Sequence, residues 1–211
     1  MEFIKNQEVD MKRVTSKFVP ALFLGISLLL PSLGEAIDRT VNCTTGQSIN
    51  VAIRSLSNGD TLKVIGACSE NVSINESRAN NITLDGGGTA TITGALASSQ
   101  VITVSGRRVT ISKFASITGG NTGIQVSRGG SARIDGNTIQ AVGNHGINVT
   151  EHSYAEIINN VIKDNASGTG ILVTDNSSVR VGYLTGNDTV AQPNTITGNG
   201  TSSGDWGLNV L

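Results

Sequence analysis

Two columns of mostly polar side chains recur around a repeated segment of the form Gly-Ile-X-Val, and both could contact an elongated ligand. The residues just before each glycine are Thr122, His145, Thr169 and Trp206. The residues between the two apolar residues of each copy are Gln125, Asn148, Leu172 and Asn209. On neighbouring strands such side chains are about 4.8 Å apart, so they could follow an extended polysaccharide. A solvated strand face without a ligand is the alternative, because it must also be polar. The candidate ligand-binding residues are Gln125, His145, Asn148 and Trp206.

A second candidate ligand-binding region is an insertion near the C-terminus. From Ile157 to Ile162 is 5 residues, whereas the equivalent step from Val181 to Ile196 is 15. Insertions in repeat proteins form loops on one face, which is often the binding face. The residues that this loop would present are Tyr183, Asn187 and Asp188. A surface loop without a function is the alternative.

Residues suited to catalysis are sparse. Cleavage of a glycosidic bond needs two carboxyl groups, one on either side of the bond, and the chain has no Asp-Asp pair. Five scattered carboxylates could hold a calcium ion if they shared one face, although solvated carboxylates at turns are the simpler interpretation. These carboxylates belong to Glu151, Asp164, Asp175, Asp188 and Asp205. No catalytic residue is assigned, and calcium is the one cofactor that the pattern leaves open.

The repeated segment also predicts the architecture. Ile124, Ile147 and Ile171 are separated by 23 and 24 residues, a period typical of stacked repeats. Two further apolar rows accompany them, so each period contains three short alternating patches of β-branched residues. The further rows are Ile134, Ile157 and Val181, and Ile139, Ile162 and Ile196. We therefore expect an all-β parallel β-helix with three short strands per coil and about six coils.

The N-terminal part of this helix departs from the regular period. Alternating patches from Leu62 to Ile92 fit coils a few residues shorter than the later ones. Before them, residues 47–57 have apolar residues at helical spacing, which predicts a capping helix as the first element of the mature chain.

Three asparagines, Asn137, Asn160 and Asn199, follow or precede turns that look equivalent. Asn tolerates turn conformations and satisfies turn groups with its side chain. We expect a buried ladder of stacked amides here rather than a set of ligands.

The N-terminal cap and first coils resemble the pectin-lyase-like superfamily of right-handed β-helix proteins. The segments that carry the resemblance are residues 47–64, 68–74 and 82–86, and it extends over residues 41–211. It implies a right-handed single-stranded β-helix and a carbohydrate-active function. Lyases of this superfamily hold calcium with clustered carboxylates and use a basic residue, and its hydrolases use paired aspartates. The Asn144-His145-Gly146 segment matches part of the hydrolases' Gly-His-Gly motif, but their aspartate motifs are absent.

Residues 1–36 have the pattern of a signal peptide. Lys12, Arg13 and Lys17 precede an apolar run over residues 18–30, followed by small residues that predict cleavage after Ala36. The run is shorter than the roughly 20 residues of a membrane-spanning helix. We expect residues 37–211 to form a secreted or periplasmic β-helix domain, without membrane attachment once the leader is removed.

Both cysteines, Cys43 and Cys68, flank the predicted capping helix. An exported chain can keep a disulfide, so we expect these two residues to be bonded and to clamp the cap to the first coil.

The net charge and the C-terminal end of the chain indicate which partners to expect. The net charge is −1 and the mature chain has no basic run, which argues against an electrostatic nucleic-acid site. The chain stops at Leu211 within a repeat strand, so we expect a truncated or covered end there, open to end-to-end self-association.

The sequence as a whole predicts an exported β-helix protein that binds extracellular or cell-envelope polysaccharide. Whether it also cleaves that polymer, as a polysaccharide lyase or glycoside hydrolase, stays open. The alternative is a non-catalytic surface or adhesion scaffold. Carboxylates gathered on one face would favour the enzyme, and their dispersal would favour the scaffold.

Overall fold

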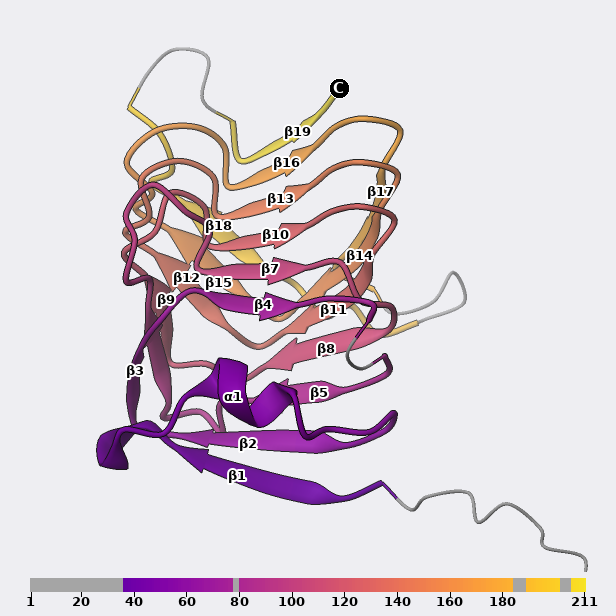
Figure 1. The fold of residues 1–211 in the computed structure, drawn as a ribbon. Coiled ribbons are helices and arrows are strands. Elements are labelled where there is room, and N and C mark those ends of the chain that lie inside the picture. Colours follow the sequence, from indigo (N-terminus) through magenta and orange to yellow (C-terminus); the bar gives the residue numbers. More distant parts are fainter. Residues whose placement is uncertain (1–35, 78–79, 184–188, 202–205) are drawn as a thin grey trace, which may run out of the picture. The chain divides into compact units, whose positions relative to one another are not determined.

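The computed structural model describes residues 36–77, 80–183, 189–201 and 206–211. In this part of the chain, six coils of three short strands each follow one another, and every strand pairs in parallel with the equivalent strand of the next coil (Figure 1). The predicted parallel β-helix is therefore confirmed. The predicted signal peptide falls, apart from Ala36, outside the described residues.

Three sheets, here called A, B and C, run along the coils. In spatial order, sheet A contains β1 (Asp38–Asn42), β2 (Thr61–Ile65), β5 (Thr83–Asp85), β8 (Val109–Ser112), β11 (Ser131–Asp135), β14 (Tyr154–Ile158) and β17 (Ser178–Val181). Sheet B contains β3 (Ala67–Ser69), β6 (Thr91–Thr93), β9 (Ser116–Thr118), β12 (Thr138–Gln140), β15 (Val161–Lys163) and β18 (Thr195–Thr197). Sheet C contains β4 (Val72–Ile74), β7 (Ile102–Val104), β10 (Ile124–Val126), β13 (Ile147–Val149), β16 (Ile171–Val173) and β19 (Leu208–Val210).

The core is a set of stacked aliphatic columns. Ile124 pairs with Ile102 on one side and with Ile147 on the other, and all three side chains are fully buried. Burial of each such side chain contributes roughly 1.5–3 kcal/mol. A one-residue slip would turn the apolar set outward, so the columns also fix the register between coils.

Most early coils are longer than the later ones, so the expectation that they are shorter is wrong, apart from the step of 22 residues between Leu62 and Leu84. Val72 pairs with Ile102, 30 residues further along the chain, and Leu84 pairs with Ile111, 27 residues further. Residues 94–101 and the described residues between β4 and β5, 75–77 and 80–82, form no strand and belong to longer turns. Surface loops accept such additions at low cost, because they do not alter the stacked strands.

The predicted cap is present as α1 (Ile49–Ile53), which is shorter than residues 47–57. Ile49 and Ile53 are buried and pack over the first coils. The Glu70 carboxylate holds the start of α1, because it accepts the backbone N–H of Ile49 at 2.7 Å and that of Asn50 at 3.2 Å. No helix among the described residues is long and apolar enough to cross a membrane.

The expectation that the capping helix is the first element is wrong, because β1 precedes it. This strand pairs with β2 and extends sheet A by one strand. A single 3₁₀ turn, η1 (Cys43–Thr45), follows it. Only Val41 of β1 is buried, so the strand lacks the alternating apolar pattern that marks the others.

Amide ladders join the coils at two turns, and their membership corrects the predicted set. Asn137 donates from Nδ2 to Oδ1 of Asn160 at 3.1 Å, and Asn160 donates in the same way to Asn194 at 3.0 Å. Asn199 belongs instead to a second ladder, where it accepts from Nδ2 of Asn165 at 2.7 Å. Asn194 occupies the position equivalent to Asn137, because each lies two residues before the inward isoleucine of its sheet B strand. Asn199 instead lies three residues after Ile196, as Asn165 does after Ile162.

The cap is tied to the first coil by a covalent bond and a buried carboxylate. Cys43 and Cys68 form the predicted disulfide. Asp60 is almost fully buried, and its side chain accepts the backbone N–H of Ser57 and that of Ile37, each at 2.9 Å. These two hydrogen bonds, with the positive charge of Arg39, lower the pKa of Asp60 below its ordinary value.

Removal of the disulfide tests the clamp. The bond closes a loop with a sequence separation of 25, so replacing both cysteines by alanine should lower the free energy of unfolding by about 3 kcal/mol. Urea denaturation measures the change. Wild-type protein reduced with dithiothreitol should show a similar loss, which separates the cross-link from the side-chain change. Equal stability of the oxidised and reduced proteins would contradict the clamp.

The buried carboxylate predicts a pH-dependent contribution to stability. A lowered folded-state pKa stabilises the protein above the unfolded-state pKa, and this stability is lost as pH falls through the folded-state value. Asp60→Asn should therefore be less stable than wild type at neutral pH, and the gap should narrow below about pH 4. Urea denaturation across pH measures it, with Asp38→Asn, at an exposed ion pair with Lys63, as the control. A gap of constant size from neutral to acid pH would contradict this role.

Candidate ligand-binding faces

The outer face of sheet C carries the predicted polar ladder in register. Gln125 pairs with Asn148, Asn148 with Leu172, and Leu172 with Asn209. Neighbouring strands of a sheet lie about 4.8 Å apart, so the ladder is a regular array along the coils. In spatial order, its members are Ser73, Thr103, Gln125, Asn148, Leu172 and Asn209.

Asn148 is chemically distinct within this ladder. Its side-chain Oδ1 is buried, and it has no hydrogen-bond partner among the described residues. An unpaired buried acceptor costs roughly 1–3 kcal/mol, so a ligand donor at this position would relieve an existing penalty. Gln125 and Leu172 flank Asn148 on the adjacent strands.

The column before each glycine is mainly a structural feature. Successive turns are joined by backbone hydrogen bonds, from Gly146 N–H to the Thr169 oxygen at 3.2 Å and from Gly170 N–H to the Trp206 oxygen at 3.0 Å. Thr169 is buried, and its own N–H donates to Nδ1 of His145 at 3.0 Å. His145 therefore stabilises a turn. Trp206 is 57% exposed and borders the ladder just before β19.

The insertion near the C-terminus is confirmed by the strand register, and the one candidate that the structure describes, Tyr183, lies beside sheet A rather than sheet C. Val181 pairs with Ile157, and Ile196 pairs with Ile162. Tyr183 is 42% exposed and follows β17 in sheet A. Asn187 and Asp188 lie outside the described residues.

The carboxylates proposed for calcium do not converge in the described part of the chain, where no group of three His, Cys, Asp or Glu residues could hold a metal ion. Glu151 accepts the backbone N–H of Arg128 at 3.1 Å. Asp175 accepts the hydroxyl of Thr150 at 2.6 Å, and Asp164 pairs with Lys163. Asp205, like Asp188, is outside the described residues. The calcium prediction gains no support from these contacts.

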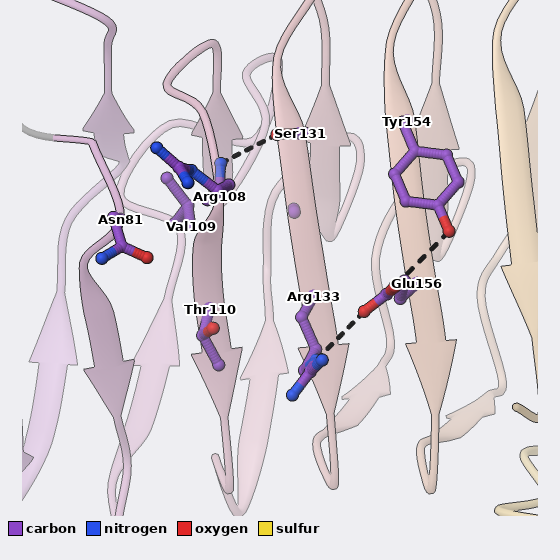
Figure 2. A pocket seen from close by; sticks show the side chains of 9 residues that line it. Asn81, Arg108, Val109, Thr110, Ser131, Arg133, Tyr154 and Glu156 are labelled. Atoms are coloured by element: carbon purple, nitrogen blue, oxygen red, sulfur yellow. Dashed lines mark hydrogen bonds and ion pairs between the residues drawn. The ribbon is translucent and has the colours of Figure 1, made fainter. Parts of the chain in front are cut away.

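A different site lies on the outer face of sheet A. A pocket of about 380 Å³ opens there across β8, β11 and β14 (Figure 2). Nε of Arg133 pairs with Oε2 of Glu156 at 3.1 Å, and the Tyr154 hydroxyl donates to Oε1 of the same carboxylate at 3.5 Å. Arg108 stands at the other side of the pocket, where its backbone N–H donates to Oγ of Ser131 at 2.8 Å.

The sequence prediction missed this pocket, although a signal for it exists. The outward residue of the second apolar row changes from coil to coil, and the strand register brings these residues side by side. They are Thr110, Arg133, Glu156 and Arg180. A row with this much charge is unusual in a chain with 15% charged residues.

Comparison with known families agrees with this architecture. A family model described as the right-handed β-helix region matches residues 63–205. The chain belongs to this family. Comparisons with curated proteins and with solved structures give no significant match. Membership in the right-handed β-helix family is consistent with the pectin-lyase-like superfamily and points to a polysaccharide-related or surface protein, but a fold alone does not determine function.

The glycines that begin the sheet C strands are required by the close approach of the next coil. A Cβ atom on Gly146 would lie 2.7 Å from the Gly170 oxygen and 2.9 Å from Nδ2 of Asn165. Gly146→Ala should therefore lower the free energy of unfolding by about 1–3 kcal/mol, measured by urea denaturation. Gly143→Ala is the matched control, since its nearest neighbours would be 3.6 Å away. Equal losses in both variants would contradict the packing argument.

Proposed function

We propose that this β-helix protein is exported and binds an extended polysaccharide along the outer face of sheet C. The observation that carries the proposal is the unpaired Oδ1 of Asn148 within an in-register ladder whose side chains, apart from Leu172, are amides and hydroxyls. Sugar hydroxyls are hydrogen-bond donors, and one bound at Asn148 would satisfy this oxygen once the half-buried side chain rotates outward to expose it.

The geometry of the ladder suits a polymer better than a small ligand. Its members come from six consecutive coils, so the same type of contact repeats along one direction. Gln125 and Asn148 supply amides that both donate and accept hydrogen bonds. The exposed ring of Trp206 borders the same face and would offer an apolar surface to a sugar ring.

Export is supported by the disulfide between Cys43 and Cys68, because disulfides form and persist mainly in oxidising compartments. A secreted or periplasmic location would also place the protein beside extracellular or cell-envelope polymers.

The contacts of the three candidate carboxylates that the structure describes favour binding without cleavage. Glu151, Asp164 and Asp175 each interact with a neighbouring side chain or backbone group. Cleavage by a glycosidase would instead use two carboxyl groups facing each other across the bond. We therefore propose that the protein is a non-catalytic surface or adhesion scaffold that binds polysaccharide.

Affinity electrophoresis in gels containing neutral or acidic polysaccharides tests the binding. Wild-type protein should be retarded by at least one polymer, and Asn148→Ala should weaken that binding about tenfold, which corresponds to roughly 1.4 kcal/mol. Gln140→Ala is the control, because Gln140 is an amide on β12 of sheet B, where its Nε2 donates to Oγ of Ser116 at 3.2 Å. Retardation that is equal in wild type and Asn148→Ala would contradict the sheet C site.

Chromatography of the same polymers after incubation with the protein, with and without calcium, tests the absence of cleavage. We expect the polymer length to stay unchanged. Shortened products that depend on calcium would identify a lyase-like enzyme and overturn the non-catalytic form of the proposal.

A further inference from the structure

The sheet A pocket differs from sheet C in its charge. Glu156 lies between Arg133 and Arg180 on the two adjacent strands, so one carboxylate faces two guanidinium groups. Among the residues that line the pocket, Arg108 adds a second positive charge to that of Arg133, and it forms no ion pair within the described chain. The pocket therefore carries an excess of positive charge.

Neighbouring carboxylates on the same face do not cancel this excess at the pocket. Asp85 and Asp135 are the nearest outward acidic residues on sheet A, two positions further along their strands than the row of Arg133. Asp85 accepts the backbone N–H of Gly87 at 3.0 Å, and Asp135 accepts from the Asn159 side chain at 3.0 Å. Neither residue lines the pocket.

The remaining lining suits a hydroxylated ring. The side chain of Tyr154 stands at the opposite side from Arg108, with its hydroxyl directed to Glu156 (Figure 2). Its ring would pack against the apolar face of a ligand. The hydroxyl of Thr110 and the amide of Asn81 lie on the side of Arg108 and can exchange hydrogen bonds with ligand hydroxyls.

The volume limits the ligand to a small one. About 380 Å³ is near the lower end of the range for small-molecule sites, which is roughly 300–1,000 Å³. This space suits one ring-sized molecule, in contrast to the open ladder of sheet C.

We propose that the sheet A pocket is a second, separate site that binds a hydroxylated carboxylate the size of one acidic sugar unit. Arg108 pairs with the ligand carboxylate, since a guanidinium offers two parallel N–H donors to such a group. Arg133 is held by Glu156 and contributes to the positive field beside it. This site does not depend on polysaccharide binding at sheet C.

Isothermal titration with D-glucuronate, compared with D-glucose, tests the proposal on the full chain. Glucuronate should bind with a dissociation constant in the millimolar range, and glucose at least tenfold more weakly. Arg108→Ala should weaken glucuronate binding at least tenfold, and Arg108→Lys should retain part of it because it keeps the charge. Arg108 is exposed, so these variants should keep the fold.

Arg128→Ala is the matched control. Arg128 is also an exposed arginine with a left-handed backbone, φ 56° against 54° for Arg108, but it pairs with Glu151 outside the pocket. Its substitution should leave glucuronate binding unchanged, as should Asn148→Ala on sheet C. The proposal is overturned if glucuronate does not bind, if glucose binds equally well, or if Arg108→Ala binds as wild type does. Loss of polysaccharide retardation in the electrophoresis would not affect this result, so the two sites fail independently.

Discussion

The structure depends on the parallel, in-register pairing of each strand with the equivalent strand of the next coil. This pairing satisfies the backbone N–H and C=O groups of one coil with those of its neighbours. It also aligns each inward side chain with its counterparts, as with Ile124, which lies between Ile102 and Ile147. Every position therefore has to fit the same position one coil away, and the sequence repeats because the contacts repeat.

The polar side chains at the turns must also match from coil to coil. Asn137 and Asn160 bond to each other and also to strand backbone, with Nδ2 of Asn160 donating to the Ile134 oxygen at 2.8 Å. The ladder begins where Oδ1 of Asn137 accepts the backbone N–H of Phe114 at 3.1 Å. Below it, Gly86 leaves room for the Phe114 ring, since a Cβ there would lie 2.8 Å from that ring. Buried amides are thus tolerated because each coil supplies partners to the next.

Repetition also explains what could be predicted from the sequence. The period of the isoleucine rows predicts three strands per coil, because inward residues must match from coil to coil. The pairing of Cys43 with Cys68 and the position of the cap were predicted as well. β1 was missed, because it covers the end of sheet A with one buried residue, Val41. The Asn199 assignment was wrong for a different reason: a second turn of the same coil also carries stacked asparagines, and Asn199 stacks on Asn165 while Asn194 continues the ladder of Asn137 and Asn160.

The candidate sites were harder to predict, because outward side chains do not pack in the core and therefore need not match from coil to coil. Their arrangement is limited by charge instead. Like charges directly opposite each other on adjacent strands are destabilising, so a charged ladder cannot repeat one residue type as an aliphatic column does. On sheet A the charges alternate instead, in the order Arg133, Glu156 and Arg180. Neutral amides face no such repulsion, which is why Gln125 and Asn148 can adjoin on sheet C. The largely neutral, polar ladder of sheet C, interrupted by Leu172, therefore suits a repeating polymer. On sheet A the varied charges produce a local pocket in which one cation, Arg108, has no ion pair among the described residues.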